Sequence, residues 1–181
     1  MKTLRSSTLA ALFCVLTSAL VYGQAPAAPP QTVAGANNFV RLDAKFASGG
    51  VTTADAFATL KQLGYRTVIN LQTASEPGVD LDAEAKAVSQ AGIKYVSLPF
   101  STAAPDLTAV DKFLEIVKDP ANQPVYLHCR SGQRANAFWM IKRVVVDGWT
   151  LDKAAEEADT LKMTNKPLRD FVAAYLKDRE K

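Results

Sequence analysis

Strand-like and helix-like segments alternate along most of this chain, and no other feature limits its possible folds so strongly. β-Branched and aromatic runs bounded by turn residues predict strands, and apolar residues at helical spacing followed by Gly or Pro predict helices. The expected strands are 38–43, 45–50, 65–71, 93–100 and 124–129, and the expected helices are 54–64, 81–92, 107–119, 135–148, 151–162 and 166–181. This alternation predicts an α/β fold with a mainly parallel central sheet flanked by helices.

The composition fits one domain. The chain has 181 residues, of which 48% are hydrophobic and 22% charged, as is typical of a globular protein that buries a core. We therefore expect a single domain over residues 38–181. The 21 basic residues are interspersed with 18 acidic ones, so we expect no nucleic-acid partner. The pattern carries no signal for an oligomeric state.

Residues 1–23 have the layout of a secretory signal peptide. A positively charged start precedes an apolar run over 9–21 that is short for a membrane span, and Gly23 closes a small-residue cleavage pattern. Cleavage after Gly23 lowers the net charge from +3 to +1, because Lys2 and Arg5 leave. We expect a secreted or periplasmic protein with no membrane association after cleavage. The alternative interpretation is an uncleaved N-terminal anchor.

The segment 24–37, rich in Ala and Pro and free of charge, predicts a flexible lead-in. Cleavage also removes Cys14, so Cys129 becomes the single cysteine of the mature chain. A lone cysteine in an exported protein indicates a reactive thiol or an intermolecular pair, and the alternative is a buried, inert side chain. An exposed thiolate in an oxidising compartment is open to oxidation, which predicts sensitivity to peroxide.

The stretch "PVYLHCRSGQRAN", residues 124–136, holds the chemistry. Cys129 follows an expected strand and precedes an expected helix that starts near Gln133 or Arg134, and ligands of open α/β sheets bind at this edge. A tight turn at Gly132 would point backbone N–H groups inward as an anion-binding nest, and the helix N-terminus adds partial positive charge. Arg134 offers a two-pronged donor to an oxyanion. Cys129 is therefore the candidate nucleophile.

The other residues of this stretch have smaller predicted roles. The loop that would bind the substrate anion consists of Arg130, Ser131, Gly132 and Gln133. Arg130 either adds positive potential at the mouth of the site or is simply solvated. Ser131 either stabilises a leaving thiolate or has no role beyond the loop. His128, the single histidine, points to the opposite face of the strand from the nucleophile. We expect it to support the loop by hydrogen bonds from behind. One His and one Cys do not make a zinc site, so we expect no metal and no cofactor.

"VYLHCRSGQRA", together with the upstream "YRTVINL" and "IKYVSLPF", resembles the cysteine-dependent superfamily of dual-specificity and tyrosine phosphatases. More narrowly, the chain resembles the bacterial beta-lactamase-hydrolase-like phosphatase domains over about residues 38–159, including "FASGGVTTADAFATLKQLGYRTVINLQ". The resemblance implies a cysteine-phosphatase-like fold. It also implies that Cys129 is the nucleophile and that Arg134 grips the phosphate.

The chain departs from the superfamily in the length of this loop. Four residues separate Cys129 from Arg134, where the phosphatases have five. A four-residue gap resembles the rhodanese sulfurtransferases, whose "CRSG-x-R" loops are similar to "CRSGQR". The shorter loop makes a smaller cradle, better sized to a persulfide or thiosulfate sulfur than to a full phosphate.

A phosphatase needs a general acid for the leaving oxygen. The resemblance places an Asp on the loop after an earlier strand, and Asp106 in "PFSTAAPDLT" is the candidate. The equal alternative is that Asp106 is an ordinary helix N-cap. Other acids are expected to be solvated: Glu76 on its loop, Asp111 one turn into the following helix, and the run Glu156, Glu157 and Asp159 on a helix face.

Three hypotheses follow. The leading one is an exported cysteine-dependent hydrolase of phosphate monoesters, whether protein phosphotyrosine, phosphoserine or a small phosphoester, acting through a Cys129 thiophosphate. The second is a rhodanese-type sulfurtransferase that carries a Cys129 persulfide. The third is a catalytically silent domain that binds a small anion. In each case the expected partner is a phosphorylated substrate or a small anion.

Overall fold

The computed structural model describes residues 32–179, and the predicted signal peptide lies outside them. The helices are α1 (Ala54–Gln62), α2 (Leu81–Gln90), α3 (Leu107–Lys118), α4 (Gln133–Val145), α5 (Leu151–Thr160) and α6 (Lys166–Arg179), with a short 3₁₀ turn η1 (Pro120–Asn122). The strands are β1 (Val40–Arg41), β2 (Phe46–Gly49), β3 (Thr67–Asn70), β4 (Lys94–Ser97) and β5 (Val125–His128). Each expected helix and strand is present, with ends that differ by a few residues.

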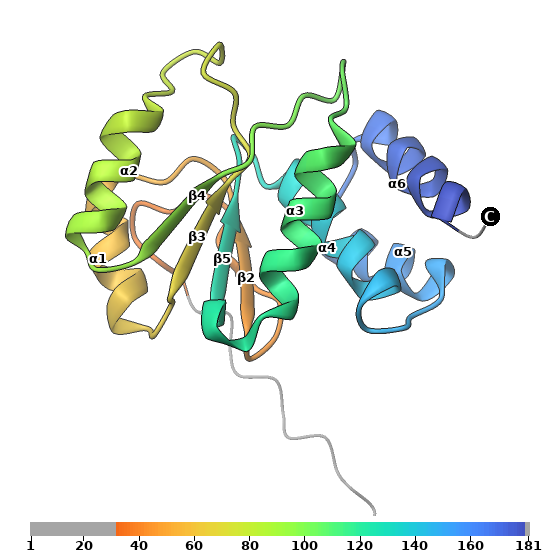
Figure 1. Ribbon diagram of the computed structural model, residues 1–181, viewed down its shortest axis with the longest axis horizontal. Helices are drawn as coiled ribbons and strands as arrows, with labels where there is room; N and C mark the ends of the chain where they lie inside the picture. The colour runs from red at the N-terminus through yellow and green to blue at the C-terminus, as the bar shows by residue number, and fades with distance from the viewer. Residues whose placement is uncertain (1–31, 180–181) are drawn as a thin grey trace, which may run out of the picture.

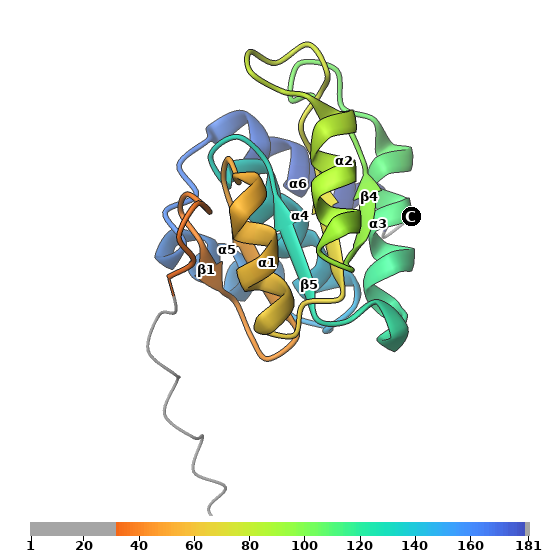
Figure 2. The ribbon, with the colours of Figure 1, turned by 90° about the vertical axis from the view of Figure 1, so that its left-hand side faces the viewer.

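The strands form one sheet in the order β1-β2-β5-β3-β4. β1 pairs antiparallel with β2, while the other pairings are parallel. Figures 1 and 2 show α1 and α2 on one face of this sheet and α3 and α4 on the other, with α5 and α6 packed outside α4. The prediction of an α/β fold with a mainly parallel central sheet is therefore confirmed.

β5 sits between β2 and β3, and each of its residues is buried. Its side chains alternate between the two faces, as in any strand. Leu127 and Cys129 belong to the core beneath α3 and α4, whereas Tyr126 packs in the core beneath α1 and α2. His128 stacks on Tyr126, with ring centroids 5.5 Å apart, so it shares that second face. The sequence correctly predicts that His128 and Cys129 point in opposite directions.

The predicted lead-in is wrong over residues 32–37. Val33 and Ala36 are buried, at 4% and 7% exposure, against the core beneath α1 and α2. The backbone N–H of Asn37 donates to the carbonyl of Val51 at 3.0 Å, and Ala36 forms an isolated bridge with Thr52. Apolar burial and backbone pairing together order this segment, so the domain includes residues before 38.

The acids predicted to be solvated on α5 are only partly so. Glu157 accepts hydrogen bonds from the indole N–H of Trp139 at 2.9 Å and from two nitrogens of Arg143 at 2.9 and 2.7 Å. Asp159 pairs with Arg169 on α6 at 2.6 Å. Glu156 is exposed, as predicted. These pairs tie the outer helices α5 and α6 together and to α4.

Asp111, predicted as a surface residue, is half-exposed and also links elements. Its carboxylate accepts a hydrogen bond from the hydroxyl of Tyr175 at 2.8 Å and pairs with Arg179, so it connects α3 to the end of α6.

Within residues 32–179, no helix has both the length and the apolar character needed to span a bilayer.

Glu157→Ala should destabilise the fold by about 2 kcal/mol, because the buried indole N–H of Trp139 and one face of Arg143 lose their acceptor. Glu156→Ala is the matched control. It lies one residue away on the exposed face, and its expected effect is within about 0.5 kcal/mol of zero. Urea unfolding of the two variants measures both. Equal effects would contradict the buried role assigned to Glu157.

Candidate active site

The loop between β5 and α4 is held at the carboxyl edge of the sheet by the end of β2. The backbone N–H of Cys129 donates to the carbonyl of Gly49 at 3.2 Å, and the N–H of Val51 donates to the carbonyl of Arg130 at 3.0 Å. Gly50 lies so close that an added Cβ would approach the Arg130 carbonyl to 2.9 Å. Gly50, the residue directly after β2, therefore lets the strand end lie against the candidate active-site loop.

Gly132 makes the turn that the sequence predicts. Its φ of +89° is the left-handed conformation, and it is the N-cap of α4, which begins at Gln133. Its backbone N–H donates to the sulfur of Cys129 at 3.2 Å. A thiolate here gains a hydrogen bond and the positive end of a 13-residue helix. The geometry is that of an anion cradle centred on Cys129.

Cys129 is 1% exposed, so the expectation of an exposed thiolate is wrong. Cys129 is the first residue after β5. Every second side chain of this strand faces α3 and α4, and the Cys129 side chain continues that alternation into the core beneath these helices. Burial limits the access of bulk oxidants to the sulfur. The predicted sensitivity to peroxide rested on an exposed sulfur, and the structure does not show one.

Arg134 lies in the first turn of α4 and is held by residues of two connections, the one between β3 and α2 and the one between β4 and α3. Its Nη1 donates to the carbonyls of Leu71 and Phe100, both at 2.9 Å, and to Glu76 Oε1 at 2.7 Å. Its Nη2 donates to Glu76 Oε2, also at 2.7 Å. Glu76 is therefore the partner of the anion-binding arginine, and the prediction of a solvated loop acid is wrong.

The two charges of this pair stabilise each other. Burial alone raises the pKa of Glu76, but hydrogen bonds from Arg134 and from the Thr73 N–H outweigh it and hold that pKa below its ordinary value of 4.5. Burial lowers the pKa of Arg134, but Glu76 and then the Cys129 sulfur raise it above its ordinary value. Arg134 thus lies within the electrostatic reach of both Glu76 and the nucleophile.

His128 supports the site in a way the sequence did not predict. Its Nε2–H donates to Glu84 Oε1 at 2.9 Å, and its buried Nδ1 has no hydrogen-bond partner in the described chain. The Glu84 carboxylate also accepts from Asn70 Nδ2, at 3.0 Å to each oxygen. The expected hydrogen bonds from the imidazole to the loop are absent from residues 32–179. His128 instead fixes the end of β5 through Glu84 on α2.

The sequence predicts that Gln133 binds the substrate anion, but its side chain is held elsewhere. Its Oε1 accepts from the N–H groups of Thr164 and Asn165 at 2.9 and 3.1 Å, and its Nε2 donates to the Lys162 carbonyl at 2.9 Å. The side chain anchors the turn between α5 and α6 to the start of α4. Gln133 is the first residue of α4, and only its backbone N–H is available to the cradle.

Arg130 and Ser131 have exposed side chains on the loop itself. The Ser131 carbonyl accepts from Asn38 Nδ2 at 3.2 Å, which fixes the backbone and leaves the hydroxyl at the surface. Arg130 makes no ion pair within residues 32–179, so its positive charge stands at the mouth of the site. Both positions are consistent with the predicted role in binding an anion.

Asp106 is the N-cap of α3. Its exposed carboxylate accepts from the Thr108 N–H at 2.9 Å and from the Thr108 hydroxyl at 2.7 Å. These hydrogen bonds lower the pKa of Asp106 below its ordinary value, which opposes proton donation near neutral pH. Of the two predicted roles, the structure shows the helix cap.

The family model described as "DSP-PTPase phosphatase fused to NAD+ Kinase" matches residues 26–171. "Probable NAD kinase 2, chloroplastic" of Oryza sativa subsp. japonica is 33% identical over 93 residues, which is 50% of this chain and 10% of that protein. "Beta-lactamase hydrolase-like protein" of Xylella fastidiosa is 29% identical over 113 residues, 59% of this chain and 25% of that protein. The chain thus spans a quarter or less of the length of these relatives.

Solved structures show the same fold. A DUF442 protein from Shewanella putrefaciens CN-32 is 26% identical with a TM-score of 0.64, covering 78% of this chain and 94% of that one. The core catalytic domain of the S. cerevisiae PP-IP phosphatase SIW14, in complex with citrate, has a TM-score of 0.65 at 22% identity, covering 80% and 88% of the two chains. At that identity the second likeness concerns the fold alone.

Glu76→Gln should lower the free energy of unfolding by about 1–2 kcal/mol at pH 7, because Arg134 loses its charged partner. The pKa of Glu76 is depressed in the folded state, so its contribution is present above the ordinary value of 4.5 and is lost as the pH falls through the lower folded value. The stability difference between wild type and variant should therefore shrink below about pH 4.5.

Urea unfolding of both proteins from pH 7 to pH 3 measures this difference. Glu156→Gln removes an exposed carboxylate of the same kind and should show a small difference at every pH. A Glu76→Gln difference that stays constant down to pH 3 would contradict the ion pair with Arg134.

Proposed function

We propose that this chain, which belongs to the family described as "DSP-PTPase phosphatase fused to NAD+ Kinase", hydrolyses phosphate monoesters through a covalent Cys129 thiophosphate. One observation carries the proposal: the Cys129 sulfur accepts a hydrogen bond from Gly132 at the N-terminus of α4, inside a loop built to hold an anion. The same positive end that favours the thiolate attracts the phosphoryl group.

In the first step, the thiolate electron pair of Cys129 attacks phosphorus. A P–S bond forms, the P–O bond to the leaving group breaks, and the leaving oxygen departs as an oxyanion that takes its proton from solvent water. In the second step water attacks phosphorus, the P–S bond breaks, and Cys129 returns as a thiolate with release of inorganic phosphate. The N–H groups at the start of α4 hold the phosphoryl oxygens in both steps.

Arg134 contributes as a fixed charge. Its contacts with Glu76 and with the carbonyls of Leu71 and Phe100 occupy Nη1 and one side of Nη2. A guanidinium has five N–H donors, so Nε and the second Nη2 hydrogen stay available for an oxyanion. Because the side chain is already held, little conformational entropy is lost when the phosphoryl group binds.

The proposed substrates are esters with a good leaving group. Asp106 is committed to capping α3, and its lowered pKa makes it a poor acid, so the leaving oxygen departs with little help. A phenol, with a pKa near 10, leaves far more easily than an alkyl alcohol. We therefore propose aryl phosphates, of which protein phosphotyrosine is one, over phosphoserine and other alkyl esters.

Sulfur transfer is the second candidate, and the four-residue spacing from Cys129 to Arg134 favours it. In this reaction the thiolate attacks the outer sulfur of thiosulfate, an S–S bond forms, and sulfite leaves. An acceptor such as cyanide then takes that sulfur as thiocyanate and restores the thiolate. The shorter loop offers fewer N–H groups than a phosphate with three oxygens can use.

We also propose that the protein acts after export. The basic start, the short apolar run and the small-residue site at residues 1–23 support this. The test is fractionation of cells that make the full chain, followed by intact mass of the soluble product. A periplasmic or secreted chain that starts at Gln24 is the expected result, and a full-length chain in the cytoplasm or membrane would overturn it.

Cys129→Ser should lower aryl phosphate turnover by at least about 1000-fold, because a hydroxyl is a far weaker nucleophile than a thiolate. The measurement uses residues 24–181 and pairs two assays: hydrolysis of p-nitrophenyl phosphate, and thiocyanate formation from thiosulfate and cyanide. Sulfur transfer without phosphatase activity would replace the leading proposal with the second. Silence in both assays would favour an anion-binding domain without catalysis.

Asp106→Asn should leave the kcat of p-nitrophenyl phosphate within about twofold of wild type and the stability nearly unchanged, because Asn caps helices as well as Asp does. Asp106→Ala should lower the stability through loss of the cap, again with little change in kcat. A large fall in kcat for Asp106→Asn, together with loss of the basic limb of the pH profile, would restore Asp106 as the general acid.

A further inference from the structure

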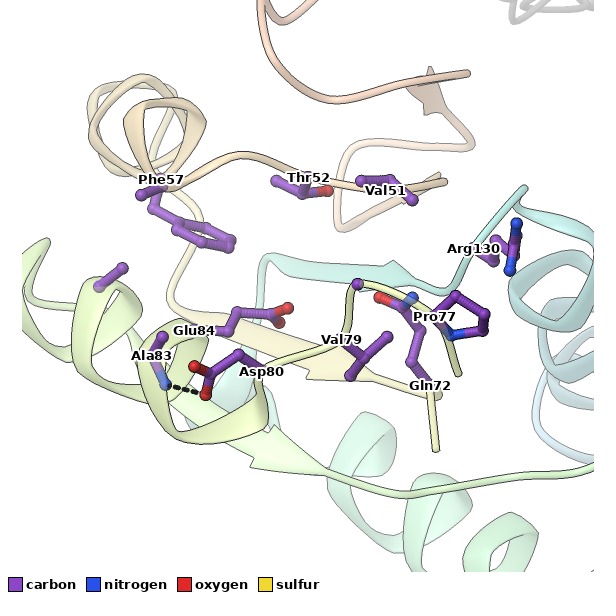
Figure 3. A pocket seen from close by; sticks show the side chains of 13 residues that line it. Val51, Thr52, Phe57, Gln72, Pro77, Val79, Asp80, Ala83, Glu84 and Arg130 are labelled. Carbon is purple, nitrogen blue, oxygen red and sulfur yellow. Dashed lines mark hydrogen bonds between the residues drawn. The ribbon is translucent and has the colours of Figure 1, made fainter. Parts of the chain in front are cut away.

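A cavity of about 400 Å³ opens beside the active-site loop, on the face of the sheet covered by α1 and α2. It is bounded by the segment before α1, the loop 72–80 between β3 and α2, and the first turns of α2 (Figure 3). Arg130, the residue next to Cys129, forms its rim. The cavity thus begins one residue away along the chain from the candidate nucleophile and extends toward the core residue Phe57.

The cavity adjoins the catalytic loop through the end of β3. The Leu71 N–H donates to the His128 carbonyl at 2.9 Å, and the Leu71 carbonyl accepts from Arg134. Gln72, the next residue, lines the cavity. Gln72, which follows β3, and Arg130, which follows Cys129, therefore both line this cavity, so it offers space to the ester substituent of a phosphoryl group bound at the loop.

Gln72 is the feature that points to a ligand. The residue is 6% exposed, and its side-chain carboxamide has no hydrogen-bond partner in residues 32–179. Its backbone is fixed by a hydrogen bond from its N–H to Asn70 Oδ1 at 2.7 Å. Figure 3 shows the carboxamide reaching into the cavity between Pro77 and Val79. A polar group bound in the cavity would supply the hydrogen-bond partners that the described chain does not give this carboxamide.

The remaining walls define the chemistry of the occupant. Val51, Phe57 and Val79 supply an apolar surface, as a flat or aliphatic body requires. Glu84 and Asp80 line the same cavity, and both carboxylates are already held, Glu84 by His128 and Asn70 and Asp80 by the Ala83 N–H. Glu84, which is mostly buried, and Asp80, which is exposed, both place negative charge on the wall and disfavour an anionic occupant.

We propose that this cavity, the Gln72 cavity, holds the leaving group of the substrate. It selects an uncharged leaving group with an apolar ring and a polar substituent that hydrogen-bonds the Gln72 carboxamide, and it rejects leaving groups that carry further negative charge. The inference rests on the proposed phosphatase function, because it assigns the leaving-group half of that same site. Gln72 is a specificity residue here and takes no part in bond making at phosphorus.

Two aryl phosphates of nearly equal shape test the proposal: 4-carbamoylphenyl phosphate and 4-carboxyphenyl phosphate, with phenyl phosphate as the reference. Wild type should prefer the carbamoyl ester to the carboxylate ester by about tenfold or more in kcat/KM. Gln72→Leu should lower kcat/KM for the carbamoyl ester about tenfold more than for phenyl phosphate. Gln90→Leu makes the same chemical change on the exposed end of α2 and should not alter the ratios.

A direct binding measurement covers the case in which Gln72→Leu fails to fold. In wild type, 4-hydroxybenzamide should shift the NMR signals of the Gln72 side-chain amide, and 4-hydroxybenzoate should not. Ratios that Gln72→Leu leaves unchanged, or a Gln72 amide that 4-hydroxybenzamide does not shift, would overturn the cavity assignment. Binding of 4-hydroxybenzamide without hydrolysis of any ester would instead overturn the proposed function and leave the cavity assignment standing.

Discussion

The parallel pairing of β5 between β2 and β3 is the constraint on which the site depends. Its register sets His128 opposite both Gly49 and Asn70, so three strand ends reach the same edge of the sheet together. Cys129 is the first residue beyond that edge. The strand ends then support the loop. Gly50 after β2 permits close approach, and the Leu71 carbonyl after β3 accepts a hydrogen bond from Arg134. A shift of one residue in this register would turn Cys129 to the wrong face.

Two carboxylates, one on each face of the sheet, hold Arg134 and His128, the residues that follow and precede Cys129 in the candidate catalytic stretch. Glu76 holds Arg134 beside the nucleophile, and Glu84 holds His128 at the end of β5. Both acids lie in or next to the connection between β3 and α2, so one short segment supports both sides of Cys129. Part of that segment also lines the Gln72 cavity. The segment thus couples the fixed charge at the phosphoryl group to the shape of the space for the leaving group.

The sequence predicted the fold and the centre of the site well, because both depend on local patterns. The strand before Cys129, the turn at Gly132 and the start of α4 are encoded in adjacent residues. Glu76, Glu84 and the anchoring role of Gln133 were missed, because their partners lie 58, 44 and 29 or more residues away along the chain. The only signal for these roles was a polar residue placed just after a strand or in the first turn of a helix. Solvated residues occur at the same places, so this signal does not reveal a distant partner. The packing of Val33 was missed because the Ala- and Pro-rich composition around it is typical of linkers.

Rapid quenching of residues 24–181 during turnover of an aryl phosphate, followed by mass spectrometry of the peptide that contains Cys129, measures the covalent intermediate directly. A thiophosphate on Cys129 that forms before phosphate release, and is absent from Cys129→Ser, is the result expected of a nucleophile at the N-terminus of α4. Phosphate release with an unmodified Cys129 peptide at every quench time, or with undiminished turnover in Cys129→Ser, would contradict it.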